Sequence, residues 1–297
     1  MSEIDLTLLA NKQTALPSLH RQFLEPRAMK SGFLTALTWT IAALGSIPLF
    51  SVIYMLIIQG GARLDFEALT ALPPAGFEDG GGFGNALVGT LVMVGIGGVI
   101  SIPVGILAAV YLAVLGPHSK LAKTARFVAK TLTGFPSILA GVFTYAILVI
   151  TFGYSALAGG VSLAVLMLPT VVLAAEEAMR QVPQKMTDAA YGMGCTRTQV
   201  ILKVVLPTAL PGILTGVMLA VAGAAGESAP LLFTALFSNY YISELMEPTA
   251  SLSILIYNFS AMPFDNQIEL AWAASLVLVL IVLVFNILAR LLGRPKY

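Results

Sequence analysis

The twenty residues Asp188–Pro207, DAAYGMGCTRTQVILKVVLP, form a polar-to-amphipathic stretch between two long apolar runs. Pro183, just before this stretch, suits the first turn of a helix, where the missing N–H of proline costs nothing. Gly194, about three turns later, suits the left-handed position that ends a helix, because glycine has no Cβ to clash there. We therefore expect one short helix that ends at Gly194.

A second short helix is predicted beyond this corner. Thr196 and Gln199 have the T-x-x-Q spacing of a capping box, in which each side chain binds the backbone N–H of the other residue. Apolar residues then recur at helical spacing, at Val200, Ile201, Val204 and Val205. Pro207 is expected to end this helix, because proline lacks the N–H and clashes with the preceding turn.

The spacing in this stretch resembles the EAA loop of ATP-binding-cassette (ABC) importer permeases, with its pattern E-A-A, three residues, G, nine residues, I-x-L-P. Its positions are occupied here by Asp188, Ala189, Ala190, Gly194, Val204, Leu206 and Pro207, with Asp188 for Glu and Val204 for Ile. The resemblance implies that the loop couples the chain to a separate ATPase subunit. Ala189 and Ala190 are small enough to let a helix approach such a partner closely.

The composition excludes a soluble domain of this size. Of the 297 residues, 58% are hydrophobic and 10% are charged, and the mean hydropathy is +0.90. The net charge of +1 does not suggest a polyanionic partner such as nucleic acid. The single cysteine, Cys195, cannot form an internal disulfide.

The chain contains no pattern of an enzyme of its own. The phosphate-binding loop G-x-x-x-x-G-K-[ST] is absent, and the two histidines, His20 and His118, have no metal-ligand spacing. We expect this chain to have no catalytic residue and to bind no cofactor or metal. If ATP drives the protein, ATP and Mg²⁺ must bind to a partner ATPase.

Six apolar stretches approach the roughly 20 residues that a helix needs to cross a bilayer. They are residues 32–58, 85–115, 127–151, 160–175, 208–237 and 268–288. The predicted fold is therefore an all-α integral membrane protein with six transmembrane helices. We expect a tail at 1–31, a permease domain at 32–292 with its core at 85–292 and its coupling loop at 180–207, and a second tail at 293–297.

The positive charges predict the orientation of these helices. Lys and Arg residues number four in the N-terminal tail, four between the second and third stretches, four from Arg180 to Lys203 and three at the C-terminus, whereas only Arg63 lies on the other side. Cytoplasmic loops are enriched in Lys and Arg. Both termini and the coupling loop are therefore predicted to be cytoplasmic.

Glu227 is the only ionisable residue of the fifth apolar stretch, at 208–237. A carboxylate within a membrane span costs on the order of 3 kcal/mol and marks a pathway or a pairing site by default. The alternative is a glutamate satisfied by a neighbouring helix, without a role in transport.

Three further runs resemble the PstA-type permeases of bacterial phosphate ABC importers. GESAPLLFTA (226–235) resembles their G-E-T-A-P-L-L-F-T signature, LPPAGFEDGGGFGNALVGTL (72–91) resembles their entry to the second span, and FPSILAGVF (135–143) resembles a run in their third. The likeness extends over nearly the whole chain beyond the N-terminal tail. It implies the type I ABC importer fold, with a substrate pathway along Glu227, Gly226, Ser228, Pro136 and Ser137.

The same resemblance implies the partners and the mechanism. They are a second permease subunit in a pseudo-twofold heterodimer, two ATPase subunits and an external phosphate-binding protein, in a bacterial inner membrane. ATP would drive alternating access to phosphate. These permeases often have an arginine one helical turn before the glutamate, where this chain has Gly223, so the sister subunit is expected to supply positive charge for the anion.

Two other functions fit the residues. One is an ABC permease for another oxyanion, such as sulfate or molybdate. The other is a secondary anion transporter driven by an ion gradient, with Glu227 as its proton relay. Dependence of uptake on a co-expressed ATPase would separate the secondary transporter from both ABC permeases.

Overall fold

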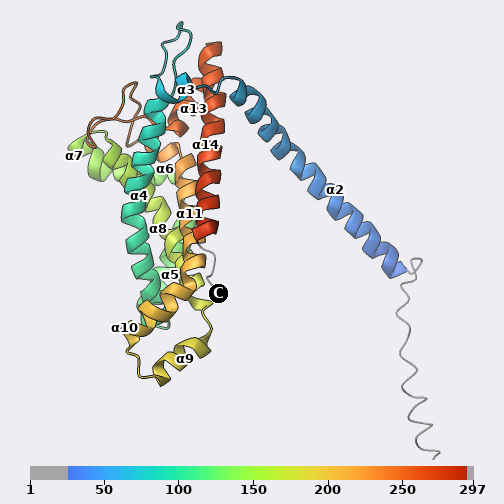
Figure 1. Ribbon diagram of the computed structural model, residues 1–297, viewed down its shortest axis with the longest axis vertical. Helices are drawn as coiled ribbons and strands as arrows, with labels where there is room; N and C mark the ends of the chain where they lie inside the picture. The colour runs from blue at the N-terminus through green and yellow to red at the C-terminus, as the bar shows by residue number, and fades with distance from the viewer. Residues whose placement is uncertain (1–25, 293–297) are drawn as a thin grey trace, which may run out of the picture. The chain divides into compact units, whose positions relative to one another are not determined.

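The computed structural model describes residues 26–292, and every regular element in that range is helical (Figure 1). The helices are α2 (Pro26–Met55), η1 (Leu56–Gly60), α3 (Phe66–Thr70), α4 (Gly84–Val110), η2 (Tyr111–Leu115), α5 (Lys120–Thr133), α6 (Ser137–Thr144), η3 (Tyr145–Val149), α7 (Ile150–Phe152), α8 (Ala156–Arg180), α9 (Gln184–Gly192), α10 (Arg197–Val200), η4 (Ile201–Val205), α11 (Leu206–Gly226), α12 (Ala229–Leu232), α13 (Leu252–Ser260) and α14 (Asp265–Leu292), where η denotes a π-helix. The all-α prediction is confirmed. Of the two predicted tails, only residues 26–31 lie within the described part, and they belong to α2.

Helix α2 forms a unit of its own up to Tyr54. Its side chains are apolar on all sides, and nearly all of them are exposed, including Trp39 and Phe50. Its hydroxyl groups are satisfied within the helix, as in the bond from Thr38 Oγ1 to Leu34 O at 2.8 Å. A helix that is apolar all round belongs in a bilayer or against other protein.

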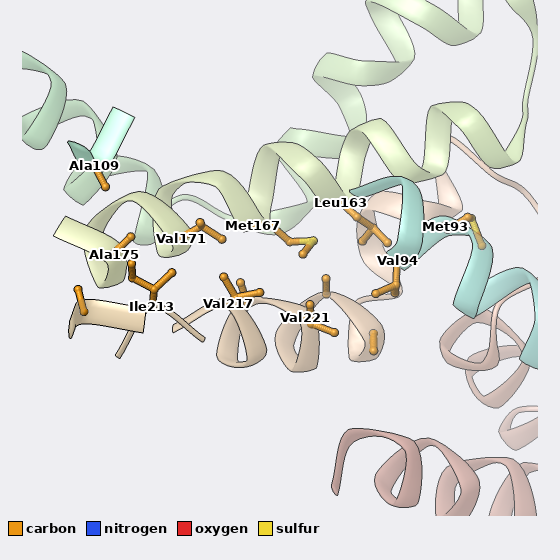
Figure 2. Close-up of a cluster of buried hydrophobic side chains, with 14 of the residues drawn as sticks. Met93, Val94, Ala109, Leu163, Met167, Val171, Ala175, Ile213, Val217 and Val221 are labelled. Atoms are coloured by element: carbon orange, nitrogen blue, oxygen red, sulfur yellow. The ribbon is translucent and has the colours of Figure 1, made fainter. Parts of the chain in front are cut away.

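Residues 55–292 contain one hydrophobic cluster built mainly from α4, α8 and α11, and a second built from α3, α13, α14 and the start of α4. Figure 2 shows side chains of α8 and α11 facing one another in two rows, with Met93 and Val94 of α4 near one end and Ala109 of α4 near the other. The α8 row consists of Leu163, Met167 and Val171, and the α11 row of Ile213, Val217 and Val221. The residues of each row are four apart, so one stripe of each helix is buried against the other.

Small residues let these helices approach one another closely, as is usual in membrane bundles. A Cβ atom at Gly105 of α4 would come within 2.6 Å of Val171 of α8, and one at Gly212 of α11 within 2.7 Å of Ala178. Gly60 of η1 lies against Trp272 of α14 in the same way. Any larger side chain at these positions would push the helices apart.

Five helical runs are long and apolar enough to span a membrane, and a bent pair would make a sixth. The five are Met29–Gly60, Gly84–Leu115, Ala156–Arg180, Arg197–Gly226 and Asp265–Leu288, and the pair is Lys120–Thr133 with Ser137–Phe152. All six predicted stretches overlap one of these, so the transmembrane pattern is confirmed. Within residues 55–292, α9 and α10 lie at one end, and α3 and α13 at the opposite end (Figure 1).

Two of the predicted spans differ from the structure. The third, predicted as one helix over 127–151, is bent by 106° between α5 and α6. The bend occurs at Gly134–Pro136, because the residue before a proline avoids the α conformation and Pro136 offers no N–H to continue the ladder. The fifth, predicted to reach Phe237, ends at Gly226, because Glu227 leaves the helix with ψ 122°.

The prediction that Pro207 ends a helix is also wrong. The chain stays helical from Arg197 to Gly226, with Pro207 in the first turn of α11. The preceding turn, η4, is a π-helix, in which the hydrogen bonds join residues five apart. Pro207 therefore stands just after the change from the π-helix η4 to the α-helix α11. In the first turn of an α-helix, the missing N–H of proline costs nothing.

Candidate functional site

The corner of the loop at 180–207 is formed by a glycine in the left-handed conformation. Helix α9 ends at Gly192, and Gly194 follows with φ +82°. Two backbone bonds close the corner, from Gly194 N to Tyr191 O at 2.9 Å and from Cys195 N to Ala190 O at 3.1 Å. The predicted left-handed corner at Gly194 is confirmed, whereas its part in coupling to an ATPase stays a prediction.

The predicted capping box begins the second helix. Thr196 N donates to Gln199 Oε1 at 2.8 Å, and Gln199 N donates to Thr196 Oγ1 at 3.4 Å. Helix α10 therefore starts at Arg197 with its first N–H groups satisfied by side chains. It continues through η4 into α11, so Leu206 and Pro207 lie within one uninterrupted helical run.

The two alanines of the motif face opposite ways. Ala190 is only 3% exposed and packs in the same cluster as Val200 and Val205, where it holds α9 against the second helix. Ala189 and Asp188 are exposed. A partner can therefore contact Ala189 directly, whereas Ala190 lies inside the corner of this chain.

Helix α9 presents an exposed apolar face that the motif did not reveal. Met186 is 44% exposed and Met193 79% exposed. Met186 lies three residues before Ala189 in α9, and Met193, the residue that caps the end of α9, lies four residues after it, so their spacing places the three on one side. Methionines adapt to irregular partner surfaces. Their helical spacing within a polar segment was the sequence signal for this face, defined here as Met186, Ala189 and Met193.

Glu227 lies at a cavity of about 280 Å³ that is lined by five segments. The lining residues are Leu132 and Thr133 of α5, Phe135 of the bend, Ser137 of α6, Leu166, Met167 and Thr170 of α8, and Leu219, Ala220, Gly223, Ala224 and Glu227 at the end of α11. The structure thus brings Ser137 and Glu227 to one cavity, although they are far apart in the sequence. Three hydroxyl groups and one carboxylate supply its polar side chains.

The main chain of Glu227 is held by two hydrogen bonds, whereas its carboxylate makes none with the described residues. Glu227 N donates to Ala224 O at 3.2 Å, and Glu227 O accepts from Ser253 Oγ of α13 at 2.9 Å. No hydrogen bond or ion pair holds the carboxylate in the described range, and no Lys, Arg or His of that range lines the cavity. The carboxylate is therefore available to a ligand or to a partner chain.

The other predicted pathway residues do not line this cavity. Pro136 and Gly226 are exposed and Ser228 is half-buried, each next in sequence to a lining residue. The two signature runs nevertheless meet, because a Cβ atom at Gly141 would come within 2.7 Å of the Cα atom of Pro230. FPSILAGVF and GESAPLLFTA therefore form one structural unit.

Known proteins resemble this chain along most of its length. Residues 101–295 match the family described as "Binding-protein-dependent transport system inner membrane component". A Haemophilus influenzae protein described as "Phosphate transport system permease protein PstA" is 38% identical over 271 residues, which cover 91% of this chain and 96% of the relative. A Methanocaldococcus jannaschii protein described as "Probable phosphate transport system permease protein PstA" is 36% identical over 260 residues, or 86% of this chain and 91% of the relative.

Solved structures confirm the fold. A chain of a bacterial alginate ABC transporter superposes with a TM-score of 0.64 at 16% identity, over 92% of this chain and 98% of the other. A chain of the MetNI methionine ABC transporter, in an inward-facing conformation, superposes with a TM-score of 0.58 at 20% identity, over 70% of this chain and 93% of the other. The shared architecture is that of ABC importer permeases.

Proposed function

Since the chain belongs to the family of binding-protein-dependent transport system inner membrane components, we propose that it is a transmembrane permease subunit of an ATP-driven importer of inorganic phosphate. The observation that supports this most is the 38% identity to a phosphate permease over 91% of the chain. The protein makes and breaks no covalent bond. It provides one half of a path across the membrane.

The proposed assembly has four kinds of component. A second, homologous permease subunit completes a pseudo-twofold pair, two ATPase subunits bind ATP and Mg²⁺, and an external binding protein delivers phosphate. The exposed face of Met186, Ala189 and Met193 is the proposed contact with the ATPase. Its support is the exposure of apolar side chains in an otherwise polar loop.

We place the chain in a bacterial inner membrane with both termini in the cytoplasm. The support is the distribution of Lys and Arg, which favours the side of the coupling loop. In the structure, the loop with α9 and α10 lies at the opposite end from α3 and α13 (Figure 1). The end with α3 and α13 would then face the binding protein.

The proposed mechanism is alternating access. Closure of the ATPase pair on ATP moves the coupling loops, and the helices tilt until the path opens outward. Phosphate enters from the binding protein, and hydrolysis returns the path to the inward-facing state. Each step changes helix positions only, so the residues of this chain act by binding and positioning.

The cavity at Glu227 suits phosphate in one respect. Phosphate near neutral pH keeps one or two protons, so the carboxylate of Glu227 can accept a hydrogen bond from it, and the hydroxyl groups of Thr133, Ser137 and Thr170 can bind its oxygens. Sulfate has no proton to donate and would be repelled. Cationic groups must come from the sister subunit, because none lines the cavity within residues 26–292.

The test is reconstitution in vesicles. The chain is co-expressed with a second permease, an ATPase and a binding protein from the same organism, and ATP-dependent uptake of radiolabelled phosphate is measured against sulfate and molybdate. Uptake of phosphate that needs ATP supports the proposal. Preference for sulfate or molybdate would assign another oxyanion, and uptake without the ATPase would assign a secondary transporter.

A further inference from the structure

Helix α4 ends in a π-helical turn whose carbonyl groups need donors. The turn, η2, is closed by the bond from Gly116 N to Tyr111 O at 2.9 Å. The last four carbonyl groups of any helix have no partner within the helix. Three of them here, at Leu112, Val114 and Leu115, accept from arginine side chains instead.

One of these arginines belongs to the coupling loop. Arg197, the first residue of α10, donates from Nη2 to Val114 O at 2.6 Å and to Leu115 O at 2.7 Å. The contact joins residues more than 80 positions apart in the sequence. A guanidinium at a helix C-terminus also gains from the partial negative charge there. Arg197 therefore binds the coupling loop to the end of α4.

The second arginine binds the same turn. Arg126 of α5 donates from Nη2 to Leu112 O at 2.7 Å and from Nε to Glu176 Oε1 of α8 at 2.5 Å. Arg180, the last residue of α8, also pairs with Glu176 at 2.8 Å. Glu176 is only 4% exposed, and two guanidinium groups balance its charge. The residue from which the coupling loop leaves α8 is thus linked to η2 as well.

These contacts form a route from the coupling loop to the cavity. The route starts at Arg197, passes through η2 to Arg126, and follows α5 to Thr133, which lines the cavity with Glu227. Because Arg197 binds η2 directly and Arg180 is linked to it through Glu176 and Arg126, we expect a displacement of the loop to carry the end of α4 and the middle of α5 with it. Packed and hydrogen-bonded segments of this kind can carry coupling between distant sites, and a measured change of coupling is the test.

We propose that Arg197 is a positioning residue through which movement of the coupling loop is transmitted to the α4–α5 corner. The proposal rests on the proposed function, since it assumes that an ATPase moves the loop. It differs from a docking role, because Arg197 contacts this chain's own backbone. Replacement of the Arg197 side chain should therefore leave ATPase binding intact, while ATP hydrolysis no longer drives transport.

The first experiment measures that connection directly in the reconstituted complex. Arg197→Gln should co-purify with the ATPase and hydrolyse ATP, while phosphate transported per ATP hydrolysed falls at least about tenfold. Lys203→Gln is the matched control, because Lys203 is an exposed cation of the same loop without a side-chain hydrogen bond in the described part of the chain. Arg197→Lys keeps a donor that can reach one carbonyl and should recover part of the ratio.

The results divide cleanly. A wild-type ratio in Arg197→Gln overturns the proposal. Loss of the assembled complex in Arg197→Gln, with Lys203→Gln intact, also overturns it, because the residue would then be a structural cap. If Arg197→Lys transports no more phosphate per ATP hydrolysed than Arg197→Gln does, then loss of the carbonyl contact is not the cause of the uncoupling.

A second experiment needs no phosphate and so separates this proposal from the proposed function. Cys195 is the only cysteine and lies beside Arg197, so a second cysteine at Leu115 allows a pair of spin labels. The distance between the labels should stay narrow and unchanged when ATP is added, because the two segments move together. Arg197→Gln should broaden or shift this distance when ATP is added.

If the distance changes with ATP even when Arg197 is present, Arg197 does not hold the loop to η2. Wild-type vesicles that take up no phosphate would refute the proposed function alone.

Discussion

Gly141 of α6 and Pro230 of α12 lie in direct backbone contact. A Cβ atom at position 141 would come within 2.7 Å of Pro230 Cα and 2.9 Å of its carbonyl oxygen, and backbone atoms cannot move aside as a flexible side chain can. This contact fixes α6, and with it Ser137, relative to the segment that contains Glu227. The geometry of the cavity therefore depends on a position that does not line it.

The first prediction concerns this contact. Gly141→Ala should lower the free energy of unfolding by about 1–3 kcal/mol, the usual cost of overpacking, and reduce phosphate uptake. Gly134→Ala is the control, because its Cβ would meet nothing closer than 3.7 Å and its φ of −94° suits any residue. Thermal unfolding in detergent compares the two. Equal melting temperatures would mean that α6 can shift without cost.

Glu227→Gln tests the role of the carboxylate. The variant keeps the size and one acceptor but removes the charge, so it should assemble normally and lose phosphate uptake or its preference over sulfate. A charge-assisted hydrogen bond of about 1.5–3 kcal/mol corresponds to roughly ten- to hundredfold discrimination. Uptake in vesicles is the measurement, with Glu269→Gln, an exposed glutamate of α14, as the control. Unchanged rate and selectivity would reduce Glu227 to a packing residue.

Gly223→Arg asks whether this chain can supply its own positive charge. A Cβ atom at Gly223 would meet no other atom within 4 Å, so the fold should tolerate the change. The new guanidinium would stand four residues before Glu227 and pair with it. We expect sulfate to compete with phosphate uptake several-fold more strongly than in the wild type. No change in competition, in a complex that still assembles, would place the anion away from this end of α11.

Ala189→Glu tests the docking face of the coupling loop. The side chain is exposed, so the protein should fold and insert, but an unpaired charge buried at the interface is unfavourable. Loss of ATPase co-purification and of uptake is expected. Gln184→Glu adds the same charge to the first turn of α9, where the helix dipole accepts it, and should keep both. An Ala189→Glu complex that binds ATPase normally would rule out this face as the docking surface.

Ala190→Glu is not a suitable test of docking. Ala190 is buried inside the corner, so misfolding is the expected result.

The orientation is tested with reporters. Fusions after Tyr297 or inserted near Arg197 should report a cytoplasmic location, and insertions at Gly81 or Asn239 an external one. The reason is the excess of Lys and Arg on the side of the coupling loop. An external signal from either of the first two sites would reverse the proposed topology.

The sequence predicted the elements that depend on local chemistry. The capping box at Thr196 and the left-handed Gly194 follow from side chains within a few residues, and both are present. Hydropathy located every apolar run, because a helix that crosses a bilayer needs about 20 predominantly apolar residues and the average over them is a strong signal. The prediction that Glu227 lies inside the fifth span is wrong, because that helix ends at Gly226. Hydropathy does not reveal where a helix stops inside an apolar run.

The parts that sequence did not reveal depend on contacts between distant segments. The bonds from Arg197 to η2 and the pairing of Arg126 with Glu176 cross many residues, so no local pattern indicates them. The continuity of the helix through Pro207 depends on the π-turn before it, and propensity alone favours a break there. The proximity of Ser137 to Glu227 follows from the bend at Pro136 and the contact of Gly141 with Pro230.

The uninterrupted helix Arg197–Gly226 has the length and continuity of a lever arm. At about 1.5 Å per residue its 30 residues extend for about 45 Å, with the coupling corner at one end and Glu227 just beyond the other. A rotation of about 5° at the base would swing the far tip by about 4 Å, more than the length of a hydrogen bond. A small tilt at the ATPase would thus be enlarged along this helix, in addition to the displacement that Arg197 passes to η2 and α5, before it reaches a bound ion at the opposite end.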